Sequence, residues 1–227
     1  PVRRIDALPL YRLLARPPIA SRFPWDRVHW FWGDERFVPH RDSGSNYRMA
    51  MDTFLSQSRV PPGNIHAVPT HNLSPVEAAA EYEATLMQYY GTQTLSAGHP
   101  LFDVTLLGIG EDGHTASLFP GQPSLEEGVR WAIAVAGPQS QPRITLTFPA
   151  LDSSRDVAFI ATGKAKRQIL LRAQSGDRAN QRPGFVLSAA FTGLPIALLH
   201  LDDHSACREC EKRNRANVFR LFVPAEN

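Results

Sequence analysis

Residues 102–121 read FDVTLLGIGEDGHTASLFPG, the most informative stretch of this sequence. Its first six residues form a largely apolar run, which predicts a buried strand. The run ends in Gly108-Ile109-Gly110, and glycine allows a tight turn and a close approach of the backbone to a ligand. In parallel α/β sheets ligands bind beyond the carboxyl ends of the strands. The stretch therefore predicts a strand of such a sheet followed by a ligand-binding loop.

Apolar runs and helix-like segments alternate along the rest of the chain. Residues 74–77, Ser-Pro-Val-Glu, combine an N-cap serine, a proline at the first helical position and a glutamate three residues after the cap. They predict a helix that runs to about Tyr90 and stops at Gly91. A second helix is expected from about Ala165 to Ala173, and further strands at 28–32, 131–135, 144–148, 157–161 and 196–201. This order predicts an α/β protein with a mostly parallel sheet and helices on both faces.

Composition narrows the class of protein. The 227 residues, 43% hydrophobic and 20% charged, suit one globular α/β domain over residues 1–227. A formal net charge of +2 is too small to indicate a nucleic-acid partner. No apolar run approaches the roughly 20 residues that span a bilayer, so no membrane contact is expected. Residues 1–6 lack the pattern of a signal peptide, and we therefore expect a cytoplasmic protein.

A zinc site near the C-terminal end was considered and set aside. Cys207 and Cys210 follow His200 and His204 within one short stretch. A tetrahedral zinc site usually draws its ligands from two separated pairs, and that spacing is missing here. The expected reading is a solvated polar tail, with no bound metal.

The glycine-rich loop also carries a candidate catalytic group. Gly108, Gly110 and Gly113 leave backbone amides accessible to an anion or an oxyanion. His114 stands directly after them, beside Asp112, and an imidazole is suited to proton transfer near neutral pH. A histidine with a purely structural role is the alternative. The setting favours a catalytic histidine, because the loop follows a buried strand.

A second polar motif, WGDERFVP at residues 32–39, follows the strand expected at 28–32. It places Arg36 at a strand end, where its guanidinium group can bind a phosphate with paired hydrogen bonds. A surface ion pair with Asp34 or Glu35 is the alternative. Ser45-Asn46-Tyr47 comes shortly afterwards and belongs to the same motif.

A third motif, TGKAK at residues 162–166, follows the strand expected at 157–161. A lysine on the first turn of a helix after a strand can meet a phosphate as a point charge. The alternative is an exposed lysine on a solvated helix face.

Together the motifs resemble the 6-phosphogluconolactonase family. Order and spacing match over residues 32–39 with 45–47, 107–121, 143–151, and Gly163 with Lys166. The resemblance covers roughly residues 8–172. It implies an α/β, Rossmann-like fold and hydrolysis of 6-phosphoglucono-1,5-lactone in the pentose phosphate pathway, without cofactor or metal. The expected partner is a phosphorylated sugar lactone, and the expected state is a monomer or homodimer.

The resemblance also implies roles for residues. His114 corresponds to the general base that activates water, and Asp112 is expected to orient it. Arg36 and Lys166 correspond to phosphate-binding positions. The other residues expected to line the substrate site are Asp34, Glu35, Asn46, Gly108, Gly110 and Gly113.

Glucosamine-6-phosphate deaminases are the nearest alternative enzymes. They share the fold and a Gly-x-Gly-x-Asp-Gly-His core, but they continue after the histidine with Ile-Ala-Phe-Asn-Glu-Pro. Here residues 115–120 read TASLFP, which favours the lactonase.

The chain departs from the family pattern at both ends. Arg3-Arg4-Ile5-Asp6-Ala7 stands where the family has a small-residue phosphate loop, and the strand before that loop is expected to be missing. Residues 174–227 are expected to form a divergent C-terminal part. Ile5 is bulky and Asp6 would repel a phosphate, so the alternative is a truncated form with weak or no activity.

Overall fold

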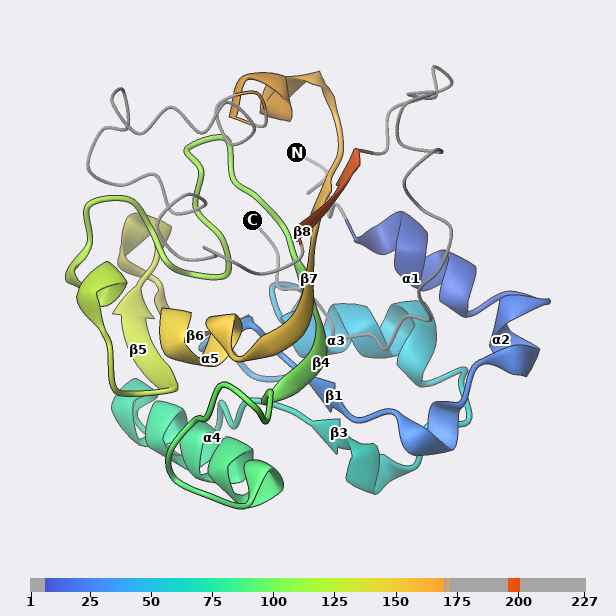
Figure 1. Ribbon diagram of the computed structural model, residues 1–227, viewed down its shortest axis with the longest axis horizontal. Helices are drawn as coiled ribbons and strands as arrows, with labels where there is room; N and C mark the ends of the chain where they lie inside the picture. The colour runs from blue at the N-terminus through green and yellow to red at the C-terminus, as the bar shows by residue number, and fades with distance from the viewer. Residues whose placement is uncertain (1–6, 170, 172–195, 201–227) are drawn as a thin grey trace.

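The computed structural model describes residues 7–169, 171 and 196–200, which form an α/β fold around parallel strands (Figure 1). β4 (Phe102–Leu107) pairs in parallel with β7 (Ser154–Ala161), and β8 (Ile196–His200) pairs in parallel with β7. β1 (Trp30–Phe31) pairs in parallel with β3 (Ile65–His66). The predicted mostly parallel arrangement is therefore confirmed.

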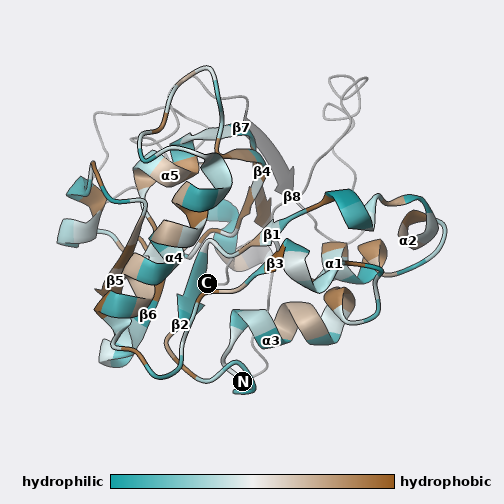
Figure 2. Cartoon of the chain, turned by 90° about the horizontal axis from the view of Figure 1, so that it is seen from below, coloured by the Kyte–Doolittle hydropathy of each residue, from teal (hydrophilic) through white to brown (hydrophobic). Residues whose placement is uncertain are grey.

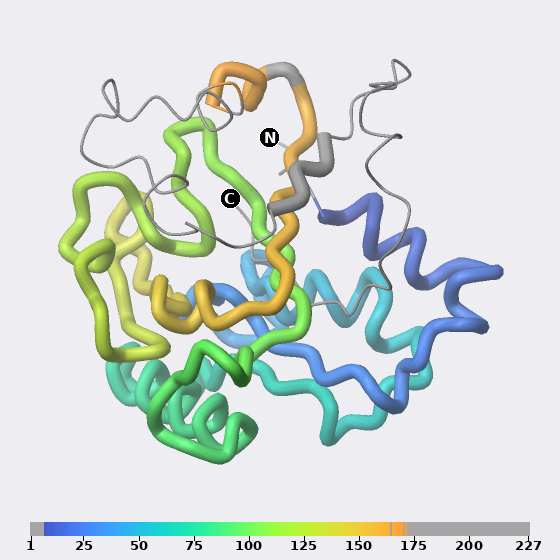
Figure 3. The backbone as a smooth tube through the Cα atoms, viewed as in Figure 1, coloured from blue at the N-terminus to red at the C-terminus, as the bar shows by residue number. Residues whose placement is uncertain are grey.

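The pairing of β4 with β7 determines where their loops lie. Leu107 at the end of β4 stands opposite Phe159, close to the end of β7. Since the strands are parallel, the loops that follow them leave the sheet at the same edge. Figure 3 shows both loops, green and orange, leaving at the same end of the strands. The glycine loop and the third motif, which contains Lys166, therefore share this edge of the sheet.

An antiparallel group of strands stands beside the parallel ones. It has the order β2-β6-β5, with β2 (Asp34–Arg36), β6 (Pro142–Leu146) and β5 (Ala132–Ala136). β5 and β6 lie close to the strands expected at 131–135 and 144–148, but they belong to this separate antiparallel group. The short connection at residues 137–141 explains the difference, because a parallel crossover needs a dozen or more residues.

Helices flank the strands on two sides. Figure 2 shows α4 and α5 on one side of β1 and β4, with α1 and α3 on the other. The helices are α1 (Leu8–Leu14), α2 (Ile19–Arg22), α3 (Asn46–Ala50), α4 (Pro75–Tyr90) and α5 (Phe148–Asp152). Single 3₁₀ turns are η1 (Trp25–Arg27), η3 (Pro62–Asn64), η4 (Pro123–Glu126), η5 (Pro138–Ser140) and η6 (Lys164–Lys166), and a π-helical turn, η2 (Met51–Leu55), follows α3.

The predicted capping of α4 is present in full. The Ser74 hydroxyl accepts from the Glu77 N–H at 3.3 Å, and the Glu77 carboxylate accepts from the Ser74 N–H at 2.7 Å. The helix ends at Gly91, whose φ of 88° is left-handed and is easily adopted only by glycine. The helix expected at 165–173 instead begins as a 3₁₀ turn, η6.

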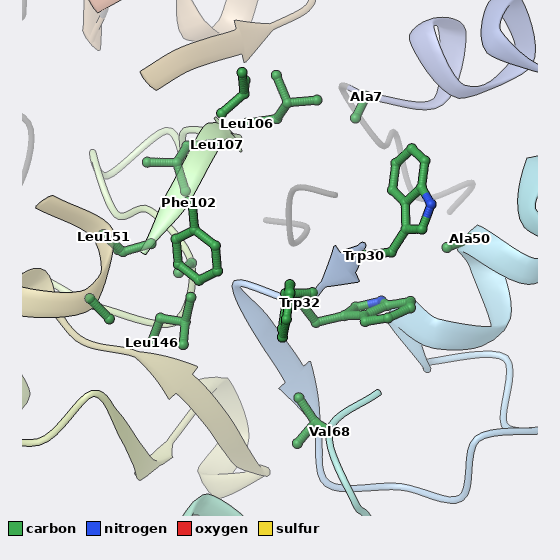
Figure 4. Close-up of a cluster of buried hydrophobic side chains, with 14 of the residues drawn as sticks. Ala7, Trp30, Trp32, Ala50, Val68, Phe102, Leu106, Leu107, Leu146 and Leu151 are labelled. Atoms are coloured by element: carbon green, nitrogen blue, oxygen red, sulfur yellow. The ribbon is translucent and has the colours of Figure 1, made fainter. Parts of the chain in front are cut away.

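A buried tyrosine ties α4 to the strand end that leads into the second motif. The Tyr82 hydroxyl accepts from the Trp32 N–H at 2.8 Å and donates to the Trp32 carbonyl at 2.9 Å. Burial raises the pKa of Tyr82, so the phenol stays protonated. Both partners belong to the apolar core, which includes Trp30, Trp32 and residues of β4 (Figure 4). The entry into β2 is therefore fixed by side-chain hydrogen bonds to the backbone.

Several sequence expectations concern parts outside the described residues. These are the phosphate-loop segment at residues 3–6, most of the C-terminal part from residue 174, and His204, Cys207 and Cys210. Of His200, only the backbone position in β8 is described. No helix in the described part of the chain combines the length and apolar character needed to cross a membrane.

A cluster of aromatic and histidine rings holds β1 and β3 against the end of α4. His29 Nδ1 lies 3.1 Å from His66 Nε2, and the Tyr89 hydroxyl contacts the His29 ring. The His66 ring also stacks on Phe31, with 4.4 Å between centroids. Burial, and secondly the neighbouring His29, lower the pKa of His66 to about 4. Burial also lowers the pKa of His29. The folded state thus favours neutral imidazoles.

We expect the free energy of unfolding to fall as pH is lowered from about 6.5 towards 4. In this range the unfolded chain binds protons that the folded cluster rejects. The loss should be about 1–2 kcal/mol, since the partly exposed cluster is screened by water. Urea unfolding of the His66→Phe variant should show a weaker pH dependence, while His71→Phe, at an exposed histidine, keeps the wild-type dependence. Equal slopes in both variants would contradict the assignment.

Candidate active site

The loop that follows β4 is closed by its own hydrogen bonds. The Gly110 N–H donates to the His114 carbonyl at 2.8 Å, and the Gly113 N–H donates to the Gly110 carbonyl at 3.0 Å. The Thr115 hydroxyl donates to the Gly108 carbonyl at 2.9 Å. Gly113 has a φ of 90°, a left-handed conformation that a side chain would disfavour. The glycine spacing thus builds a compact turn that presents His114.

His114 and Asp112 form a hydrogen-bonded pair within this turn. The His114 Nδ1 lies 2.5 Å from an Asp112 carboxylate oxygen, which also accepts from the His114 N–H at 3.1 Å. Burial by itself would raise the pKa of Asp112, but the hydrogen bond and charge of His114 bring it below its usual value. An ionised Asp112 holds the proton on Nδ1, which leaves Nε2 as the basic nitrogen. The predicted pairing of these two residues is therefore present.

The imidazole is held on its other sides by the backbone and a ring. A Cβ atom added at Gly110 would collide with the His114 ring and with the Asp112 carboxylate. The Phe119 ring lies 4.6 Å from the His114 ring, centroid to centroid. The side chain of His114 is only 13% exposed. These contacts restrict the ring to a narrow range of orientations.

Asp34 lies at the centre of a buried polar network that anchors the same loop. The Ser117 hydroxyl donates to the Asp34 carboxylate, and the Asn46 amide donates to it at 3.2 Å. Arg143 Nη1 lies 3.7 Å from Asp34 and 3.3 Å from the Ser117 hydroxyl. All four side chains are buried. The second motif and the glycine loop, far apart in sequence, are thus joined through one carboxylate.

Glu35 binds the backbone at the start of α3. Its carboxylate accepts from the N–H groups of Arg36, Asn46 and Tyr47 at 2.7–2.9 Å and from the Ser45 hydroxyl at 3.1 Å. Burial raises the pKa of Glu35 to about 8, although the Asn46 and Tyr47 hydrogen bonds act in the opposite direction. Glu35 therefore shapes the loop between β2 and α3.

The two predicted phosphate-binding residues lie in different surroundings. Arg36 is buried, and its Nη1 donates to the Gly44 carbonyl at 2.8 Å, so the alternative of a surface ion pair is wrong. Lys166 is partly exposed on η6, just beyond the carboxyl end of β7. Within the described ranges, no group of three or more His, Cys, Asp or Glu side chains could hold a metal ion.

Arg143, Ser117 and Phe119 contact the candidate site, but sequence reasoning gave them no role. All three lie inside stretches that carried the family resemblance. A possible signal was an arginine at the start of an otherwise apolar strand, which is uncommon unless the charge is paired. Their partners come from other strands, so no local pattern could name them.

The protein is of the α/β class in which parallel strands carry polar loops at their carboxyl ends, the place where ligands bind in such sheets. Residues 7–193 match the model of the family described as glucosamine-6-phosphate isomerases/6-phosphogluconolactonase. The chain belongs to this family. The match extends beyond the 8–172 range expected from the motifs.

Individual relatives agree with this assignment. The chain is 44% identical over 163 residues to a 6-phosphogluconolactonase of Synechocystis, covering 71% of this chain and 65% of the relative. It is 42% identical over 163 residues to the chloroplastic 6-phosphogluconolactonase 3 of Arabidopsis thaliana, covering 69% and 50%. The chain thus spans less than two thirds of these relatives. The crystal structure of 6-phosphogluconolactonase from Thermotoga maritima superposes with a TM-score of 0.69 at 30% identity, covering 87% of this chain and 82% of that one.

We expect Gly110→Ala to displace the His114 ring, because the new methyl group and the imidazole cannot occupy the same space. Overpacking of this kind destabilises by about 1–3 kcal/mol. The imidazole resonances of His114 should shift, and urea unfolding should show the loss. Gly98→Ala is the matched control, since a Cβ atom there meets nothing within 4 Å. Unchanged His114 resonances in Gly110→Ala would contradict the close contact.

Proposed function

We propose that this chain hydrolyses 6-phospho-D-glucono-1,5-lactone to 6-phosphogluconate, a reaction of the pentose phosphate pathway. The observation that carries the proposal is the His114–Asp112 pair in a glycine turn at the carboxyl end of β4. Two curated relatives carry the name 6-phosphogluconolactonase. The chain has Thr115–Pro120 where a deaminase would have its Phe-Asn-Glu segment. The substrate is thus a phosphorylated sugar lactone, and no nucleic acid or membrane takes part.

Water attacks the carbonyl carbon of the lactone while His114 Nε2 accepts its proton. A δ-lactone is an activated ester, so the step requires neither a covalent nucleophile nor a cofactor. The resulting tetrahedral intermediate collapses as His114 returns the proton to the ring oxygen, which opens the ring. Asp112 keeps the imidazole in the tautomer that these transfers require.

The oxyanion of the intermediate is held by backbone amides of the glycine loop. The amides of Gly110 and Gly113 already donate within the loop. Other backbone amides of residues 108–113 therefore hold the oxyanion. A preorganised donor of this kind commonly contributes about 10²–10³ in rate.

Arg36 and Lys166 bind the phosphate at the far end of the substrate. Lys166 offers a partly exposed ammonium group at the same sheet edge as the glycine loop. Arg36 adds positive charge from β2, where burial limits the screening of that charge. Asp34, Glu35 and Asn46 support this part of the site through their hydrogen bonds, and phosphate binding positions the lactone carbon for attack.

A cytoplasmic monomer or homodimer is the setting we propose. The names of several plant relatives include the word chloroplastic. A weak or inactive form is the alternative to an efficient enzyme. Measuring lactone hydrolysis by the purified chain separates the two.

His114→Asn should lower kcat by roughly 100- to 10,000-fold, because the base that activates water is lost. The rate is followed by acid release in a weakly buffered solution and corrected for spontaneous hydrolysis of the lactone. His71→Asn, at an exposed position outside the site, should behave as wild type. If kcat survived the change at His114, that residue would not be the base.

Lys166→Ala should weaken binding of 6-phosphogluconate at least tenfold, while binding of unphosphorylated gluconate changes little. Calorimetric titration with both ligands measures the difference. Arg167→Ala removes the neighbouring, exposed cation and serves as the matched control. Equal losses for both ligands would mean that Lys166 supports the fold or the sugar rather than the phosphate.

A further inference from the structure

Arg143 is the buried cation most closely tied to the catalytic turn. It stands near the start of β6, opposite Arg36 in the register with β2. Its side chain is 8% exposed and passes over Gly137, where an added Cβ atom would collide with its Nε. The guanidinium group is thus directed by the backbone of the β5–β6 connection.

The far end of Arg143 touches two residues of the glycine-loop segment. Its Cζ lies 5.5 Å from the centroid of the Phe119 ring, a cation–π distance. Its Nη1 lies 3.3 Å from the Ser117 hydroxyl and 3.7 Å from Asp34. Phe119 in turn packs against His114, with 4.6 Å between ring centroids. An unbroken series of contacts therefore runs from β6 to the imidazole.

We infer that Arg143, acting through Phe119 and Ser117, is a positioning residue that fixes the imidazole of His114 for proton transfer. The inference rests on the proposed function. Asp112 orients the ring through Nδ1, and Phe119 limits its rotation from a second direction. The guanidinium group of Arg143 keeps the Phe119 ring in place. Its contact with Ser117 fixes the backbone of the same segment two residues before Phe119. Arg143 itself touches no reacting atom.

Because Arg143 does not touch the reacting atoms, we expect its replacement to change kcat rather than substrate affinity. A misplaced base slows proton transfer, and Phe119→Leu misplaces it without changing the groups that bind the phosphate. Asp112 contacts the ring directly, and Arg143 reaches it through Phe119.

The test compares Phe119→Leu, Arg143→Met and Arg143→Lys. Phe119→Leu leaves the Asp34–Arg143–Ser117 network intact, which guards against a simple failure to fold. We expect Phe119→Leu and Arg143→Met each to lower kcat roughly 10- to 100-fold, with KM changed less than threefold. Arg143→Lys keeps the positive charge beside Phe119 and should retain more of kcat than Arg143→Met.

The double variant Phe119→Leu/Arg143→Met should be no slower than the slower single variant, because both changes break one series of contacts. Arg130→Met is the matched control. Arg130 pairs with Glu83 at 2.7 Å and is 46% exposed, and its loss should not alter kcat. A rise in KM at constant kcat would make Arg143 a substrate-binding residue. A lower melting temperature with an unchanged kcat would make it merely structural.

A second readout does not depend on turnover. In ¹H–¹⁵N spectra of the imidazoles, with His114 assigned from the His114→Asn variant, wild type should show a single tautomer protonated on Nδ1. Phe119→Leu should show a mixture of tautomers. Absence of lactone hydrolysis in wild type would defeat the proposed function alone. Identical spectra in wild type and Phe119→Leu would overturn the positioning role.

Discussion

The structure depends on the buried carboxylate of Asp34, whose negative charge needs hydrogen-bond donors or a cation beside it. Ser117, which hydrogen-bonds to it, is 83 residues away in the sequence. A buried charge left without its partner destabilises a protein by about 3–5 kcal/mol. The fold therefore holds only when β2, β6 and the glycine-loop segment meet at this carboxylate. The requirement for compensation couples the position of the loop to the stability of the antiparallel strands.

Residues without side chains make this meeting possible. Gly110 lies so close to the His114–Asp112 pair, and Gly137 so close to Arg143, that a Cβ atom at either position would collide with them. Each glycine thus permits one side chain to pack directly against the backbone. Glycine loses more conformational entropy on folding than other residues. Here that cost is offset because the neighbouring side chain, His114 or Arg143, is held with little freedom.

The sequence predicted those parts of the fold whose signals are local. The bounds of β4 followed from a largely apolar run, and those of α4 from its capping residues and Gly91. The pairing of His114 with Asp112 followed from two positions in one turn. Arg36 was expected to bind a phosphate or to form a surface ion pair; the surface pair is wrong, because its guanidinium group is buried and donates to the β2–α3 loop. Arg143 was missed for the same reason: its partners lie on strands and loops that only the tertiary fold brings together.

The parallel pairing of β4 with β7 has a consequence for how the chain is made. Phe102 stands opposite Ser154, so the strand that begins the glycine loop gains this neighbour only after some fifty more residues have been synthesised, a matter of seconds at the ribosome. The hydrogen-bonded network around Asp34 is likewise complete only after Arg143 has been synthesised. The glycine turn therefore cannot gain its full set of contacts until β6 and β7 have been synthesised. During that interval its apolar strand is exposed to chaperones and to neighbouring chains.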